Sequence, residues 1–118
     1  MSAMNELIAR VFTARNKAQL EHWGTGKYAE HMALGVFYED VIDALDALVE
    51  NYQGLFGKIT VQLPSLTASK DILTYLQDEA DWIETNRDEI ANASQVIGNL
   101  VDALTAVYTK TSYLLSLK

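Results

Sequence analysis

One continuous stripe of apolar residues constrains the fold of this chain more than any other feature. Within residues 27–56, large apolar side chains recur at intervals of three or four residues, at Leu34, Phe37, Val41, Leu45, Leu48, Tyr52 and Leu55. Because an α-helix brings residues three and four apart onto the same side, this spacing predicts one long helix with one side in a core. The sequence therefore indicates a helical protein.

Three further segments show the same helical spacing. The first runs from about residue 3 to residue 22, and glycines from Gly24 onward end it. The next carries apolar residues from 72 to 90. A turn around Asn92 separates it from the last segment, which Ser94 is expected to cap. The four segments predict four helices.

Residues 57–68 join the second and third predicted helices. Pro64 lies inside this stretch and no second strand is near it, so we expect a packed linker rather than a strand. Thr67 or Ser69 could cap the following helix, with Asp71 in its first turn. The linker is long enough to let helices two and three run parallel. We therefore expect one all-α domain over residues 1–118, a four-helix bundle with one long crossover.

The charge of the chain argues against several kinds of partner. The 16 acidic residues outnumber the 9 basic ones, and the formal charge is −7 with no cluster of Lys or Arg. Nucleic-acid binding and attachment to an anionic membrane both need such a cluster and are disfavoured. There is no cysteine, which excludes disulfides and thiolate sites. No run approaches the ~20 apolar residues of a membrane span, so we expect a soluble cytoplasmic protein.

The stretch "HWGTGKYAEH" holds both histidines of the chain, His22 and His31, at its two ends. Further along the second helix, Asp46 and Glu50 are four residues apart, so both can reach one ion. Imidazole nitrogen with carboxylate oxygen is a ligand set suited to iron, zinc or manganese. This pattern indicates a metal site, although a solvated acidic side of an amphipathic helix explains the carboxylates equally well.

The length of the second helix decides how such a site could form. His31 and Asp46 are 15 residues apart, which is about 22 Å along a helix. They cannot bind the same ion within one chain. They could do so across a two-fold axis between antiparallel copies of this helix, where each end meets the middle of its mate. We therefore expect a self-associating protein with a split site.

In this order and spacing, His22-Trp23, His31, Asp46 and Glu50 resemble the inter-subunit ferroxidase motif of the Dps family. These proteins are the miniferritins of the ferritin-like superfamily. The resemblance implies a ferritin-like bundle in which one subunit supplies the histidines and its two-fold mate the Asp and Glu. The chain also looks like small proteins of tailed phages, which would place it in an infected bacterium.

The resemblance also implies an activity. The expected function is binding of Fe(II) at a mono-iron or di-iron site, oxidation by peroxide or oxygen, and mineral storage in a shell that could be a dodecameric cage. Trp23 could intercept radical oxidants beside the site, or it could pack in the core or in an interface. The alternative is a non-catalytic helical oligomer, a phage structural or host-interaction protein, with a degenerate or structural divalent-metal site that zinc could occupy.

Two departures from the family pattern concern the site directly. The segment between His22 and His31 is three residues shorter than is usual in the family, and Gly35 stands where the family has a further carboxylate. Asp43 or Glu39 could replace that carboxylate. We therefore include Asp43 among the candidate ligands.

Overall fold

The computed structural model describes residues 2–62 and 70–117, and these residues are almost entirely helical. Within them there are five helices and no strand: α1 (Ala3–Gly24), α2 (Tyr28–Phe56), α3 (Ile72–Thr85), α4 (Arg87–Ala91) and α5 (Gln95–Ser116). The expected all-α class is confirmed.

Three helices begin at a side chain that accepts a hydrogen bond from the backbone N–H three residues later. These caps are Ser2 for α1 at 3.1 Å, Asp71 for α3 at 3.1 Å and Ser94 for α5 at 3.2 Å. Each satisfies one of the N–H groups that a helix start leaves without a partner. Ser94 was expected, whereas Asp71 is the cap itself and not a first-turn residue. Thr67 and Ser69 lie outside the described residues.

The third predicted helix is interrupted at Asn86, which separates α3 from α4. The Asn86 side-chain amide donates to the carbonyl of Trp82 at 2.8 Å, and the same carbonyl also accepts from the backbone N–H of Asn86 at 3.0 Å. The α4 helix then ends at Asn92, whose φ of 52° is left-handed. Asn tolerates that conformation better than most residues, which places the turn where the sequence predicted it.

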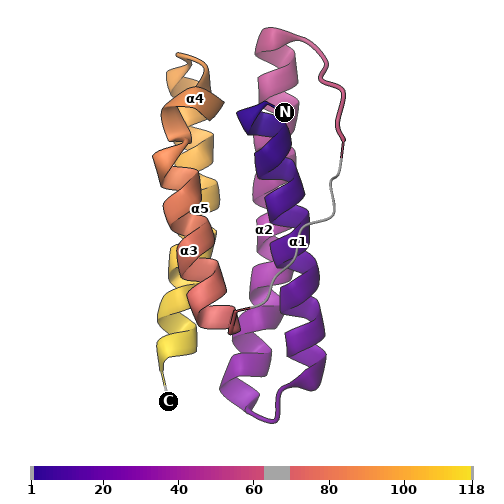
Figure 1. The fold of residues 1–118 in the computed structure, drawn as a ribbon, viewed down its shortest axis with the longest axis vertical. Helices are drawn as coiled ribbons and strands as arrows, with labels where there is room; N and C mark the ends of the chain where they lie inside the picture. The colour runs from indigo at the N-terminus through magenta and orange to yellow at the C-terminus, as the bar shows by residue number, and fades with distance from the viewer. Residues whose placement is uncertain (1, 63–69, 118) are drawn as a thin grey trace.

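The helices form a bundle in which α1 and α2 are antiparallel neighbours (Figure 1). The α2 helix also packs on α5, while α3 and α4 pack on α5 and on α1. Figure 1 shows α2 and α3 running in the same direction, with α1 and α5 running in the opposite one. None of the described helices is long and apolar enough to cross a membrane.

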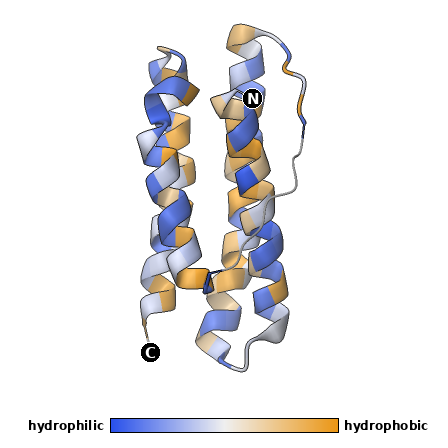
Figure 2. Cartoon of the chain, viewed as in Figure 1, coloured by the Kyte–Doolittle hydropathy of each residue, from blue (hydrophilic) through white to orange (hydrophobic). Residues whose placement is uncertain are grey.

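The core lies along the central axis of the bundle, where the apolar stripe of α2 meets α1 and α5 (Figure 2). Leu34, Phe37, Val41 and Leu48 are completely buried. Leu55 belongs to the same spacing but is 56% exposed, because it lies in the last turn of α2 at the end of the bundle. The stripe therefore predicted the core correctly except at its end.

The described part of the linker, residues 57–62, has no secondary structure and returns along α1. The side chain of Asn5 holds it there through two hydrogen bonds with the backbone of Gln62, donating at 2.9 Å and accepting at 3.0 Å. Ile59 packs against the core from this segment. It is therefore packed, as expected, and forms no strand over these residues.

Candidate metal site

The two histidines lie against each other where α1 passes into α2. His22 is in the last turn of α1 and His31 in the first turn of α2. Their rings are stacked, with 3.7 Å between the centroids and 17° between the planes. The Nδ1 of His22 lies 2.6 Å from the carbonyl oxygen of His31, and the Nδ1 of His31 lies 2.8 Å from the carbonyl oxygen of His22.

These reciprocal hydrogen bonds decide where the ring protons lie. A carbonyl oxygen can only accept, so each Nδ1 must carry a hydrogen and donate. In a neutral ring the lone pair is then on Nε2. This is the tautomer that metal-binding histidines commonly use, with Nδ1–H oriented by a backbone carbonyl. Both His22 and His31 are therefore prepared to offer Nε2 to a ligand.

The stacking also limits which ion the two rings can share. An imidazole ligand binds an ion that lies in its own ring plane, at about 2.0–2.1 Å for zinc. An ion midway between rings that are 3.7 Å apart and nearly parallel would lie far outside both planes. In this arrangement His22 and His31 can each bind an ion of their own. Joint chelation of one ion requires the rings to rotate apart.

Gly35 forms the surface on which the His22 ring rests. A Cβ atom at residue 35 would lie 3.0 Å from Cε1 and 3.3 Å from Nδ1 of His22. Such distances are too short for undisturbed packing, so any side chain at this position would displace the ring. The edge of Tyr38 closes another side, with 5.4 Å between its ring centroid and that of His22. A glycine at residue 35 therefore permits the histidine pair, where the family resemblance has a carboxylate.

The candidate carboxylates lie elsewhere on α2. Asp43, Asp46 and Glu50 are all exposed, and none of them forms an ion pair or hydrogen bond with a described residue. Over residues 2–62 and 70–117 of one chain, no three His, Asp or Glu side chains are grouped closely enough to hold an ion. The fold thus brings the two histidines together and leaves the carboxylates apart from them, as the helix length requires.

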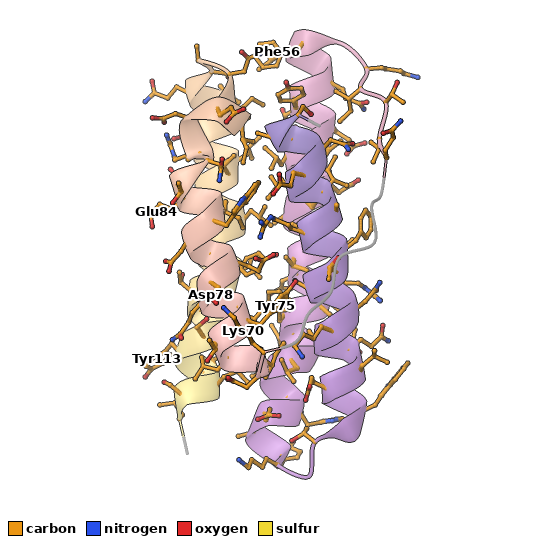
Figure 3. The ribbon with its side chains drawn as sticks, viewed as in Figure 1. Phe56, Lys70, Tyr75, Asp78, Glu84 and Tyr113 are labelled. Carbon is orange, nitrogen blue, oxygen red and sulfur yellow. The ribbon has the colours of Figure 1, made fainter. Side chains whose placement is uncertain are left out.

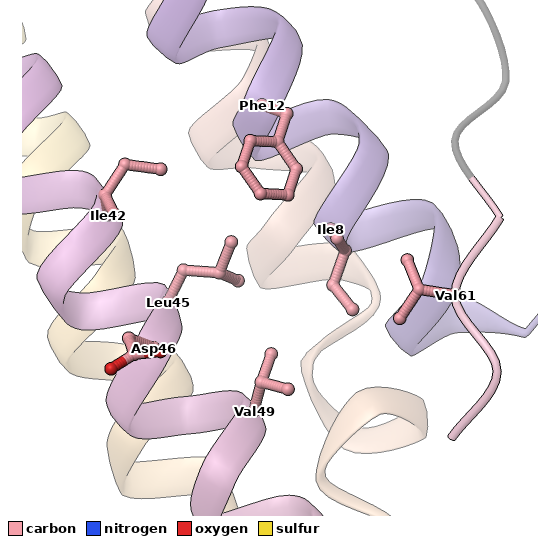
Figure 4. Close-up of a pocket in the computed structure, with 7 residues that line it drawn as sticks. All are labelled: Ile8, Phe12, Ile42, Leu45, Asp46, Val49 and Val61. Carbon is pink, nitrogen blue, oxygen red and sulfur yellow. The ribbon is translucent and has the colours of Figure 1, made fainter. Parts of the chain in front are cut away.

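Asp46 lies at an apolar depression of about 210 Å³ on the surface formed by α1 and α2 (Figure 4). Its other lining residues are apolar and come from α1, α2 and the segment 57–62: Ile8, Phe12, Ile42, Leu45, Val49 and Val61. Among these apolar residues, the stripe that the sequence showed in α2 indicated only Leu45. It could not reveal Phe12 or Val61, because their positions depend on how α1 and the linker pack.

Trp23 is 68% exposed at the end of α1. The sequence left open whether Trp23 packs in the core, and this alternative is wrong. No described residue forms a hydrogen bond with its indole. A large exposed aromatic next to a histidine pair suits a contact with another molecule.

A second polar cluster lies inside the bundle, and it was not predicted. Glu79 of α3 is only 7% exposed and accepts a hydrogen bond from Arg10 Nη1 of α1 at 2.6 Å. The Arg10 guanidinium lies 4.3 Å from the ring centroid of Trp82. Burial raises the pKa of the Glu79 carboxyl, and the charge of Arg10 offsets part of that rise. Tyr75 points into the same region from α3 (Figure 3), and burial raises the pKa of its hydroxyl.

A signal for this cluster was present in the sequence. Glu79 occupies the buried side of α3 together with Leu76 and Ile83, at intervals of three and four residues. A carboxylate in a core stripe needs a positive partner, because an unpaired buried charge is costly. The sequence alone could not show which of the bases on other helices provides it.

Comparison with known proteins identifies a family but no relative of known structure. Residues 22–115 match the model of a family of unknown function, DUF5856. The match begins at the first histidine and includes His31, the α2 carboxylates and almost all of α5. No curated protein and no solved structure matches the chain.

Proposed function

Since the chain belongs to DUF5856, a family of unknown function, we propose a function from the site itself. Two copies form a two-fold dimer that binds Fe(II) between the histidines of one copy and the carboxylates of the other. His22 and His31 supply Nε2, and Asp46 and Glu50 of the mate supply oxygen. Asp43 is a further oxygen ligand, in place of the carboxylate that Gly35 cannot provide.

One observation carries this proposal: the reciprocal hydrogen bonds of the histidines. They orient both rings and leave both Nε2 atoms available, as the backbone partners of metal-binding histidines do. The carboxylates of Asp43, Asp46 and Glu50, which form no ion pair with a described residue, supply oxygen ligands that complement the histidine nitrogens. The order of the helices also supports the resemblance to a ferritin-like bundle, since α2 and α3 are parallel and are not direct neighbours.

The proposed reaction is iron oxidation followed by mineral storage. Two Fe(II) ions each give one electron to one hydrogen peroxide, whose O–O bond breaks, and two protons complete the two waters formed. Molecular oxygen is the other candidate oxidant. Trp23 next to the site would intercept radical by-products, and further association of dimers into a dodecameric cage would enclose the mineral.

A second candidate function is favoured by the near-parallel histidine rings. Because they cannot chelate one ion without rotating, the pair also suits a purely structural lock between α1 and α2. The protein would then be a non-catalytic helical oligomer, with at most a structural divalent ion such as zinc.

Fe(II) titration distinguishes the two functions. We expect fast oxidation by peroxide in the wild type and its loss in His31→Ala and in Asp46→Ala. Asp40→Ala is the matched control, because Asp40 is an exposed carboxylate of α2 that does not line the depression beside Asp46. No fast oxidation in the wild type, or indifference to the His31 and Asp46 variants, would overturn this site and support the non-catalytic function.

Mixing the two inactive variants tests whether the site is split between subunits. A heterodimer of His31→Ala and Asp46→Ala has one site that lacks both ligands and one site that is intact. Random exchange of subunits makes half of the dimers mixed, so we expect about one quarter of the wild-type activity to return. If both variants are inactive and mixing restores nothing, each site belongs to a single chain.

A further inference from the structure

A guanidinium without a carboxylate partner lies in the middle of the surface formed by α1 and α2. Arg15 of α1 lies over the ring of Tyr38 of α2, with 5.4 Å between its Cζ and the ring centroid. Its one hydrogen bond within the described residues is to the neighbouring Asn16, at 3.2 Å. It forms no ion pair with a described residue, whereas Arg10 and Arg87 each pair with two carboxylates.

Two carboxylates lie beside Arg15 without pairing with it. Glu39 and Asp43 line the same open depression, of about 470 Å³, together with Arg15, Tyr38 and Ile42. Both carboxylates are exposed and form no ion pair with a described residue. One surface thus presents an unpaired cation and unpaired anions next to each other. A two-fold axis through such a surface would pair each with its opposite on the mate.

The register of the proposed dimer predicts which residues meet. If two α2 helices are antiparallel and His31 of one lies opposite Asp46 of the other, facing residues have numbers that add to 77. Residues 38 and 39 also add to 77, so the axis passes between them. Tyr38, with Arg15 over its ring, then lies opposite Glu39 of the mate. Asp43 is one helical turn further along.

We infer that Arg15 of each copy pairs with Glu39 of the mate, and that these two symmetric ion pairs set the register of a homodimer whose contact surface is the outer side of α1 and α2. This inference rests on the proposed function for the register. Arg15 is suited to the task because its guanidinium is already oriented by Tyr38, so less freedom is lost when the pair forms. The apolar residues around Asp46, among them Phe12, Ile42 and Val49, would be covered in the same contact.

Charge reversal tests the pairing by sedimentation equilibrium on metal-free protein at low salt. We expect Arg15→Glu and Glu39→Arg each to raise the dimer dissociation constant by about tenfold, and the double variant to return it close to the wild-type value. Lys110→Glu and Glu84→Arg are the matched controls. Both residues are exposed, and they belong to α5 and α3, across the bundle from α1 and α2 (Figure 1), so they should leave the constant unchanged.

A folding check keeps the test decisive. Arg15→Gln removes the charge but keeps much of the contact with Tyr38, so it should weaken the dimer with an unchanged helical circular dichroism spectrum. The pairing is overturned if the single variants Arg15→Glu and Glu39→Arg behave like the controls. It is also overturned if they weaken the dimer and the double variant does not restore it. A chain that stays monomeric at all concentrations overturns it together with the proposed function. Rescue of the dimer in a protein that binds no Fe(II) supports the pairing and removes the proposed function alone.

Discussion

Gly35 stands in the interior of the longest helix, where a glycine normally lowers stability relative to alanine. The structure gives a local reason for it: the His22 ring occupies the space that a side chain would fill. The glycine thus permits the stacked histidines at the expense of helix propensity. Gly54 is in the same helix and has no atom within 4 Å of the position of an added Cβ.

Alanine substitutions at the two glycines should therefore have different effects. We expect Gly54→Ala to raise the free energy of unfolding by about 0.5–1 kcal/mol, because alanine is the better helix former. Gly35→Ala should give no such gain, and it should change the NMR signals of both histidine rings because His22 must move. Chemical denaturation measures the first effect. Equal stabilisation by the two substitutions would show that the His22 contact is unimportant.

Among the elements, the linker after α2 depends on another helix for its position. It has no hydrogen-bonded structure of its own over residues 57–62, and the amide of Asn5 supplies both partners for the backbone of Gln62. Asn5 is only 7% exposed, so loss of its side chain would leave backbone groups of the linker without these partners. Val61, which lines the depression beside Asp46, is held in place by the same contact.

We expect Asn5→Ala to lower the free energy of unfolding by about 1–2 kcal/mol, since two partly buried hydrogen bonds are lost. The amide hydrogen of Gln62 should exchange faster, by a factor that corresponds to a similar loss of free energy. Asn51→Ala is the control, because the Asn51 side chain is exposed and, among the described residues, bonds only to Ala47 of its own helix. If exchange at Gln62 is unchanged in Asn5→Ala, something other than this amide holds the linker.

For the whole molecule, the cluster around Glu79 makes stability depend on pH. Glu79 joins α3 to α1 through Arg10, and its carboxyl is harder to ionise in the folded bundle than in the unfolded chain. Between its ordinary pKa of 4.5 and the raised folded value, the native state therefore binds more protons than the unfolded state. The contribution of Glu79 to stability is complete below pH 4.5 and decreases as pH rises through that window.

Glu79→Gln should remove this decrease. We expect the free energy of unfolding of the variant, relative to the wild type, to rise as pH increases from about 4 to about 7, because only the wild type loses the bound proton. Urea denaturation at several pH values measures it. Glu84→Gln, at an exposed carboxylate of the same helix, should show no such trend, and parallel curves for wild type and Glu79→Gln would contradict the assignment.

The sequence by itself determined the helical elements and the separation of His31 from Asp46 along the second helix. The spacing of apolar residues fixed where the long helices lie, since burial of one side follows directly from a period of 3.6 residues. Gly24 marked the end of the first helix, and Ser94 marked the beginning of the last. The rise of a helix fixed that His31 and Asp46 cannot share an ion within one molecule. These are local properties, which a linear pattern contains.

Only the tertiary structure decided how the parts of the site are arranged. The reciprocal bonds of His22 and His31, the His22 ring packed on Gly35 and the Arg15 guanidinium over Tyr38 all join residues of different helices. Their geometry depends on how α1 packs against α2, and side-chain contacts across a helix interface leave no periodic trace in the sequence. The Arg10–Glu79 pair could not be predicted for the same reason. A carboxylate in the core indicates that a positive partner exists, but its identity depends on how the helices pack.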